Sequence, residues 1–396
     1  MNLNILILTD PFASPAYNPR LRTMCDYLMS IGWHVDVYTE KGEICFPHTY
    51  PIYEIPIYKT NSLVEWGVKS FVSLFFDWRN RYFSRKVQNT IRNNIYDLVV
   101  CCTFSTFPLR AALDIAQIRH IPLHVDLRDI EEQVPGAQYQ SHRQWWLLPF
   151  RNLYKHINIH RRNRVLKQAQ SITSVSPWHI NFLRSINANT ALIYNGFDCQ
   201  LFYPKDTPSK QFTIAYVGRI YEQNMQDPTL LFQALQHLDI DLRIAWYTSP
   251  EGQLRIQQMA KDYQIEHLMQ YNNYVPIDQV PDILHQASIL LVLSNNATIS
   301  GAHGIMTTKF FEALGVEKPI LCVRSDEEYL AQIINKTNAG VSAKDIDEIV
   351  AFIKDKYHEW TINHFTHQPI NLAQKQQFTR QYQAQQFEEL FLSLVK

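Results

Sequence analysis

The chain alternates short apolar segments with helical patterns, and it does so in two separate runs. In the first run, a buried strand is expected at Leu3 to Leu8, a helix at Arg20 to Ile31 and a second strand at Trp33 to Tyr38. A polar stretch with two prolines, Asp198 to Gln211, interrupts the pattern, which restarts at Phe212. Alternation of this kind implies parallel sheets with right-handed crossovers. The sequence therefore predicts an α/β protein with two doubly wound halves.

The length of the chain supports this division, because 396 residues are too many for one ordinary core. The break predicts an N-terminal domain at 1–203 and a C-terminal domain at 204–370. The remaining residues, 371–396, carry a long glutamine-rich helical pattern. Two such halves joined by a linker imply a cleft between them, with ligands bound beyond the carboxyl ends of the strands.

The composition excludes several classes of protein. Lysine and arginine number 37 and so do aspartate and glutamate, so no general attraction to nucleic acid is expected. The six cysteines are scattered without a CxxC pair or zinc-like spacing, which favours a reduced, cytoplasmic protein with no metal. No export signal is expected, and no apolar run reaches the ~20 residues of a membrane-spanning helix.

The segment from Gly301 to Cys322 is typical of a glycine-bearing loop, a short helix and a buried strand. Such a unit directs unpaired backbone N–H groups to the helix N-terminus, which favours a phosphate. Lys309 and Glu312 are three residues apart and share one helical face. A cation near a phosphate, with a carboxylate that accepts from sugar hydroxyls, is typical of a nucleotide-sugar site. The alternative is an amphipathic helix that buries Phe310 and carries Lys309 and Glu312 as a surface ion pair.

Four passages, in the correct order, resemble the retaining family 4 of the GT-B glycosyltransferases. They are Ser174-Val175-Ser176-Pro177, Tyr194-Asn195-Gly196-Phe197-Asp198, Tyr216-Val217-Gly218-Arg219, and Lys309-Phe310-Phe311-Glu312-Ala313-Leu314 with Lys318-Pro319-Ile320. Asp126-Leu127-Arg128-Asp129 is further similar to members that build capsule, O-antigen and other surface polysaccharides. The resemblance implies two Rossmann-like domains facing each other across a cleft, with a C-terminal helix returning toward the N-terminal domain.

The resemblance implies a donor site in the C-terminal domain. Glu312 would accept hydrogen bonds from the nucleotide ribose, and Arg219 would hold the diphosphate as the nucleotide leaves. Lys309 would assist Arg219. The loop before the helix would add Gly304 and the backbone N–H groups of Thr307 and Thr308. His303 lies in the same loop and is a further candidate to contact a phosphate or sugar, with a role in loop structure as the alternative.

The resemblance also implies an acceptor side in the N-terminal domain. Asp126, at the end of a strand, would position or deprotonate the acceptor hydroxyl, which makes it a catalytic candidate together with Arg219 and Glu312. Its alternative is a structural carboxylate paired with Arg128. Further candidates for the acceptor or phosphate side are Arg20, Arg22, Arg128 and Asp129, of which the first two have loop capping as an alternative.

The sequence departs from the family pattern at three points. Gly304 stands where a first glutamate is usual, no lysine follows Arg219 between Tyr221 and Gln226, and the first loop lacks paired glycines. These departures leave the stereochemical outcome open, retaining or inverting. They also leave open a non-catalytic role.

The N-terminal half contains a second signal, an acid-free stretch from Gln133 to Phe197 in which basic and aromatic residues are interleaved. An earlier segment, Trp66 to Asn94, has the same character. Helices of this kind suit an anionic membrane surface. The alternatives are a core with a solvated basic face and, with less support, nucleic-acid binding. The residues expected to face a membrane are Trp145, Trp146, Arg151, Lys155, Arg161 and Arg162.

Together these features predict a cytoplasmic, membrane-peripheral glycosyltransferase of surface-glycan synthesis. It would take a sugar from a nucleotide diphosphate donor to a lipid-linked or polysaccharide acceptor at the inner membrane surface, without a cofactor, a metal or nucleic acid. Two alternatives remain open. One is a nucleotide-sugar epimerase on the same fold, and the other is a degenerate, non-catalytic partner subunit.

Overall fold

The structure, a computed structural model, describes residues 2–10, 19–42, 44, 46–57, 68, 71–73, 75–104, 106–133, 148–220, 226–294 and 304–395, with backbone only for 148–151. The chain divides into two compact units, which are described separately. Unit 1 comprises Met1–Tyr194 and Gln383–Lys396, and unit 2 comprises Asn195–Tyr382.

Unit 1 is built on a parallel sheet with strand order β3-β2-β1-β4-β5-β6-β7. The interior strand β1 aligns Ile5 with Val35 on one side and with Leu98 on the other. Every residue of β4 and β5 is buried, as expected for a parallel sheet covered on both faces. The strands are β1 (Asn4–Thr9), β2 (His34–Glu40), β3 (Ile52–Ile55), β4 (Leu98–Thr103), β5 (Leu123–Leu127), β6 (Ser171–Ser174) and β7 (Thr190–Leu192).

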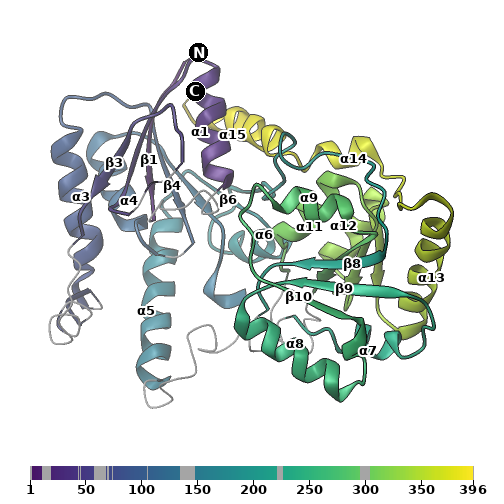
Figure 1. The fold of residues 1–396 in the computed structure, drawn as a ribbon. Coiled ribbons are helices and arrows are strands. Elements are labelled where there is room, and N and C mark those ends of the chain that lie inside the picture. The colour runs from purple at the N-terminus through teal and green to yellow at the C-terminus, as the bar shows by residue number, and fades with distance from the viewer. Residues whose placement is uncertain are drawn as a thin grey trace. The chain divides into compact units, whose positions relative to one another are not determined.

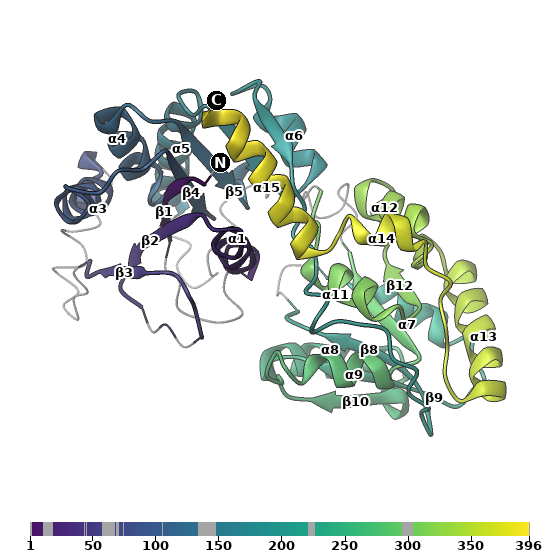
Figure 2. The same cartoon turned by 90° about the horizontal axis from the view of Figure 1, so that it is seen from above.

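Alternating residues of β1 divide the core of unit 1 between two helical layers. Ile5 and Ile7 pack in one cluster with residues of α1 and α15, whereas Leu6 and Leu8 pack in another with residues of α3, α4 and α5. Figures 1 and 2 show α1 and α15 near each other in this unit, where Tyr27 donates to Glu388 over 2.5 Å. The helices are α1 (Pro19–Ser30), α3 (Trp78–Thr90), α4 (Leu109–Arg119), η1 (Glu131–Gln133), α5 (Leu148–Leu166), α6 (Pro177–Leu183) and α15 (Arg380–Val395).

Unit 2 repeats the design with strand order β10-β9-β8-β11-β12-β13, again parallel. Ile289, Leu291 and Leu293 of β11 belong to one core cluster, so the alternate residues of this strand face the opposite layer. The strands are β8 (Phe212–Val217), β9 (Leu242–Tyr247), β10 (Met269–Asn272), β11 (Ile289–Leu293), β12 (Ile320–Val323) and β13 (Gly340–Ala343).

The helices of unit 2 cover both faces of its sheet. Residues of α7, α8 and α13 pack in the cluster that contains Leu291, whereas α9 and α11 pack against each other and contact the sheet separately. The helices are α7 (Thr229–Leu235), α8 (Pro250–Asp262), η3 (Glu266–Leu268), α9 (Val280–Gln286), α11 (Thr308–Val316), α12 (Tyr329–Thr337), α13 (Ile346–Asn363) and α14 (Leu372–Gln376).

The tail differs from the expected continuous helix at 371–396, because it consists of α14 and α15 with a break between them. At the break, Phe197 donates its N–H to the carbonyl of Phe378 over 2.9 Å, and Arg380 donates to the carbonyl of Phe197 over 2.9 Å. Phe197 and Phe378 are both buried. A tertiary pairing of backbone groups thus replaces one turn of helix.

Two parallel sheets flanked by helices confirm the predicted α/β fold class. Among the helices of the described ranges, none is long and apolar enough to cross a membrane.

Candidate functional site

The strand order of each sheet reverses direction at one point. In unit 1 the chain moves from β1 to its neighbour β2 and later returns to the opposite side of β1 as β4. In unit 2 it moves from β8 to β9 and returns beside β8 as β11. Doubly wound sheets bind ligands beyond the carboxyl ends of the strands at such switch points. Each unit therefore has one edge at which polar side chains are candidates for a ligand-binding site.

The switch point of unit 2 lies where Gly218 and Arg219 follow β8 and where the connection to α11 follows β11. Gly304 is buried and adopts a left-handed conformation, with φ 58°. Thr307 precedes α11 in an extended conformation and makes no side-chain cap, while Phe310 donates to its carbonyl over 3.2 Å. The first backbone N–H groups of α11 have no partner within the helix, which suits an anion at this edge.

The side chain of Lys309 passes directly over Gly218. A Cβ atom at position 218 would lie 1.8 Å from the Cε atom of Lys309, and the φ of +145° also disfavours any other residue. The Nζ atom of Lys309 lies 5.8 Å from the ring centroid of Tyr216, whose hydroxyl donates to the carbonyl of Arg219 over 2.7 Å. The glycine thus lets the lysine reach the edge beside Arg219, whose side chain is exposed.

The charged groups at this edge have shifted proton affinities. Burial raises the pKa of Glu312 to about 7, although the charges of Arg380 and Lys309 oppose the shift. Burial lowers the pKa of Lys309, with Glu312 opposing that shift and Arg219 adding to it. Perturbed groups of this kind concentrate at functional sites.

Lys309 and Glu312 do not form the surface ion pair that was the alternative interpretation. Both are half-buried, and no salt bridge or hydrogen bond joins them in the part of the chain that the structure describes. Within the same ranges the Glu312 carboxylate accepts no hydrogen bond. A half-buried acid with a raised pKa and no hydrogen-bond donor is suited to accept hydrogen bonds from a ligand.

The structure brings Arg219, Lys309, Glu312, Thr307 and Thr308 to one edge of unit 2. His303 lies outside the described residues. Arg380 is an addition that the sequence did not suggest, because it is the first residue of α15 and lies 68 positions after Glu312 in the chain. No local motif links the two, so only the fold reveals that its charge acts on Glu312.

In unit 1, Asp126 is buried inside the sheet and bound by Arg20. The Nη2 atom of Arg20 lies 2.8 Å from Oδ1 of Asp126, and its Nε donates to Oδ2 over 3.1 Å. Thr173 donates to Oδ1 over 2.7 Å, and Arg20 also donates to the carbonyls of Ile193 and Tyr194. Burial acts to raise the pKa of Asp126, but Arg20 outweighs it and the net pKa is lowered. This arrangement is typical of a structural ion pair.

Within the described residues, none of the remaining acceptor-side candidates is shown in an ion pair with Asp126. The partner of Asp126 is Arg20 rather than Arg128, and Arg128 instead contacts Asp10, with Nη2 3.3 Å from Oδ1. Arg22 lies over the ring of Phe46, 4.2 Å from its centroid. Asp129 is exposed. Asp126 and Arg128, both within the described ranges, therefore do not form the ion pair that was the alternative interpretation of Asp126.

One of the residues expected to face a membrane does not do so. Arg162 is fully buried, and its guanidinium binds Glu131 over 2.7 Å and Glu132 over 2.5 Å. These acids lie just before the acid-free stretch, so they neutralise a charge that the sequence pattern assigned to the surface. Lys155 is half-buried. Trp145 and Trp146 lie outside the described residues, as does the side chain of Arg151.

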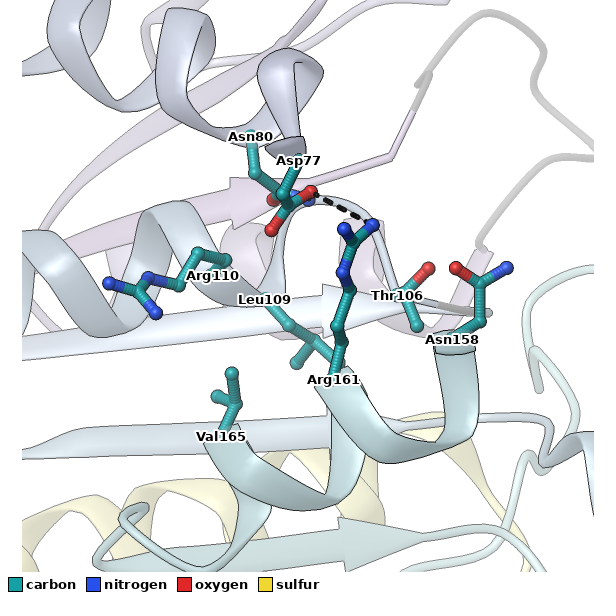
Figure 3. Close-up of a pocket in the computed structure, with 8 residues that line it drawn as sticks. All are labelled: Asp77, Asn80, Thr106, Leu109, Arg110, Asn158, Arg161 and Val165. Carbon is teal, nitrogen blue, oxygen red and sulfur yellow. Dashed lines mark hydrogen bonds and ion pairs between the residues drawn. The ribbon is translucent and has the colours of Figure 1, made fainter. Parts of the chain in front are cut away.

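Arg161 contributes to a small pocket in unit 1. Figure 3 shows its guanidinium directed at Asp77, 4.0 Å away, and it also donates to the carbonyl of Ser73 over 2.9 Å. The volume is about 20 Å³, enough for about one water molecule and too small for a sugar. The lining residues are Asp77, Asn80, Thr106, Leu109, Arg110, Asn158, Arg161 and Val165.

No protein-family model matches this sequence. No curated protein matches it either. Solved structures do, over nearly the whole chain. Sucrose-phosphate synthase from Thermosynechococcus elongatus is 16% identical with a TM-score of 0.67, and the match covers 99% of both chains. HepE from Anabaena, solved with UDP and glucose, is 15% identical with a TM-score of 0.66 over 99% of this chain and 100% of its own.

A third similar structure is the lipopolysaccharide outer core galactosyltransferase WaaB in its apo form. It is 12% identical with a TM-score of 0.59, and the match covers 99% of both chains. The fold of this chain is therefore the GT-B fold, two Rossmann-like domains, as expected.

Proposed function

We propose that this chain is a glycosyltransferase that moves a sugar from a nucleotide diphosphate sugar to a lipid-linked or polysaccharide acceptor in surface-glycan synthesis. The observation that carries the proposal is the group formed by Arg219, Lys309 and Glu312 at the switch point of unit 2. It offers two cations for a diphosphate and one acid, without a hydrogen-bond donor in the described chain, for ribose hydroxyls. Support comes from structures on the same fold, among them HepE with UDP-glucose and the galactosyltransferase WaaB.

In this proposal unit 2 binds the donor and unit 1 binds the acceptor. Arg219 and Lys309 hold the diphosphate and stabilise the charge that develops on the leaving nucleotide. The N–H groups at Thr307 and Thr308 add the dipole of α11, which also favours negative charge. Because these groups offset the diphosphate charge, we expect transfer to proceed without a metal. Gly304 supplies no carboxylate, so the family's usual first acid takes no part.

A thermal-shift panel tests the donor site. The protein is melted with UDP, GDP, ADP and CDP and with their common sugar conjugates. A nucleotide at 100 times its dissociation constant adds ~2.7 kcal/mol to the free energy of unfolding. We expect one base to raise the melting temperature selectively. Absence of any shift would contradict a donor site, and binding without turnover on every acceptor would favour the non-catalytic alternative left open by Gly304.

We further propose that unit 1 binds an anionic membrane surface from the cytoplasmic side. Phe71, Phe75 and Phe76 are 60%, 53% and 59% exposed, which is unusual for three large apolar side chains in one short segment. Arg161 of α5 donates to the carbonyl of Ser73, so this segment adjoins α5. Tyr154, two helical turns before Arg161 and on the same face of α5, is also exposed.

The charge next to this aromatic surface is positive. Arg81, Arg85 and Lys86 of α3 are exposed, and each basic group near an anionic bilayer contributes about 1 kcal/mol. Burial of the phenylalanine rings at the headgroup boundary adds an apolar contribution to the binding free energy, beyond the attraction between basic side chains and anionic headgroups. Exposed rings and basic side chains together match an anionic lipid surface better than they match nucleic acid.

Vesicle sedimentation tests the membrane proposal. Wild type is expected to sediment with vesicles that contain phosphatidylglycerol and much less with pure phosphatidylcholine. Replacing Phe71, Phe75 and Phe76 with Ser is expected to weaken binding at least about tenfold, since each buried aromatic side chain contributes about 1.5–3 kcal/mol. Ile95→Ser with Ile118→Ser, which alters other exposed apolar residues, serves as the control. Equal sedimentation of all three proteins would contradict the proposal.

A further inference from the structure

The switch point of unit 1 contains a second charged group, distinct from Arg20 and Asp126. Asp10 follows β1, and its Oδ2 accepts from the backbone N–H of Phe104, which follows β4, over 2.9 Å. Thr103, the last residue of β4, lies 3.4 Å from the same oxygen. Thr39, in β2, donates to the carbonyl of Asp10 over 3.0 Å. Asp10 therefore ties together the strand ends at the position where a doubly wound sheet binds ligands.

Arg128 completes this group from the end of β5. Its guanidinium carbon lies 3.3 Å from the ring centroid of Phe104, so the planar group is stacked on an aromatic face. It is only 5% exposed. The single hydrogen bond of its side chain within the described residues is the 3.3 Å contact to Asp10, and its Nε is buried without a partner.

A buried arginine with so few side-chain hydrogen bonds is unusual, as a comparison with Arg20 shows. Arg20 is equally buried, at 5% exposed, and it uses Nε, Nη1 and Nη2 in hydrogen bonds to Asp126 and to two carbonyls. Arg128 has the same five side-chain N–H donors, but among the described residues it uses one of them, in the 3.3 Å bond to Asp10. Buried donors are almost always satisfied, so unused ones at a ligand-binding edge point to a missing acceptor.

We propose that Arg128, oriented by Asp10 and Phe104, binds a phosphate group of the acceptor at the switch point of unit 1. A guanidinium stacked on a ring presents its N–H groups in one plane, which matches two oxygens of a phosphate. Asp10 accepts from one N–H of Nη2, which keeps the arginine in place and leaves the buried N–H of Nε for the ligand. This inference rests on the proposed transferase function for the identity of the ligand as an acceptor. It replaces Asp126 by Arg128 as the acceptor-binding residue of unit 1.

The phosphate has two sources, a lipid-borne phosphate or a soluble sugar phosphate. Decyl phosphate below its micelle concentration and glucose 1-phosphate are the two probes, and binding is measured by isothermal titration. All proteins carry Arg219→Gln, so that the cations of unit 2 contribute less to phosphate binding. The probe that binds more tightly identifies the source.

Two variants distinguish an anion site from a structural ion pair. Asp10→Asn removes the competing charge but keeps an oxygen for Phe104, and it is expected to tighten phosphate binding several-fold. The double variant Asp10→Asn with Arg128→Gln removes both charges together, so no unpaired buried charge threatens the fold. It is expected to weaken binding at least about tenfold. Arg110→Gln, which alters an arginine half-exposed beside Asp114, is the control.

Equal phosphate affinity in the parent protein, Asp10→Asn and the double variant would overturn the inference. The outcome is independent of the donor site, because nucleotide binding is read separately in the thermal-shift panel. Loss of phosphate binding in the double variant without any nucleotide shift would retain the anion site and reject the transferase function. Unchanged phosphate affinity in the double variant together with a selective nucleotide shift would retain the transferase function and reject Arg128 as the phosphate-binding residue.

Discussion

Replacing Glu312 with Gln is expected to weaken nucleotide binding about 10-fold to 100-fold, because the amide cannot supply the charged acceptor that ribose hydroxyls would bind. Hydrogen bonds to charged groups are worth about 1.5–3 kcal/mol, which corresponds to this range. The measurement is titration of the nucleotide that the thermal-shift panel selects. Glu266→Gln, which removes an exposed acid elsewhere in unit 2, is the matched control and should leave the affinity unchanged.

The pH dependence of binding offers a second test of the same residue. The pKa of Glu312 is about 7, so the carboxylate is mostly neutral at pH 6 and mostly charged at pH 8. If the carboxylate accepts from the ribose, affinity should rise across this window in wild type and much less in Glu312→Gln. A wild-type affinity that is level from pH 6 to pH 8 would contradict the assignment.

Stability should change in the opposite direction to binding. The folded pKa of about 7 exceeds the ordinary value of 4.5, so between these two pH values the folded state holds more protons than the unfolded state. The free energy of unfolding therefore falls as pH rises through this window. The loss of stability caused by the charged Glu312 carboxylate is fully present above about pH 7. Because Glu312 is half-buried, we expect Glu312→Gln to gain about 1–3 kcal/mol at pH 8 and little near pH 4.5, as measured by urea unfolding.

The fold was predictable because its signals are local. The apolar spacing of Leu109 to Arg119 predicts a helix, and α4 has the same bounds. The edge strand β3 (Ile52–Ile55) escapes the same analysis, since Tyr53 and Glu54 are exposed and leave too short an apolar run. The break before α15 escapes it too, because the pairing partner Phe197 lies about 180 residues earlier in the chain.

The candidate sites were predictable where their residues share one element. Lys309 and Glu312 are recognisable together because three residues separate them on one helix. The contact of Lys309 with Gly218 and the charge of Arg380 beside Glu312 depend on the folded topology. Likewise, the nearest arginine in sequence suggested Arg128 as the partner of Asp126, whereas helix α1 supplies Arg20 from 106 positions earlier.

Breaking the ion pair between Arg20 and Asp126 is expected to have the largest effect on stability. Removing one member leaves an uncompensated buried charge, which costs about 3–5 kcal/mol. Asp126→Ala and Arg20→Ala should each lower the free energy of unfolding by this amount at pH 7, measured in urea. Asp114→Ala, which breaks the more exposed pair with Arg110 on α4, should cost less than about 1 kcal/mol.

A double replacement and a pH series separate the structural role of this pair from a catalytic one. Arg20→Met with Asp126→Leu leaves no lone charge, so it should cost far less than the sum of the single variants. The folded pKa of Asp126 is lowered, so the contribution of its carboxylate to the free energy of unfolding is present above the ordinary pKa of 3.8 and is lost as pH falls through the folded value.

His124, which lies on the same strand, does not add a charge at neutral pH. Burial lowers its pKa to about 4, so it stays neutral at pH 7 and hydrogen-bonds Ser171 and Thr173.

Asp126→Asn decides between the two roles, because it removes the charge while preserving the shape. As a structural residue, Asp126 should lose stability in this variant while the folded fraction turns over sugar at nearly the wild-type rate. As an acceptor base it would instead lower turnover by the folded fraction about 100-fold or more, whatever the change in the urea midpoint. The buried position, the bidentate arginine and the lowered pKa all favour the first result, since a carboxylate held this way is a poor proton acceptor.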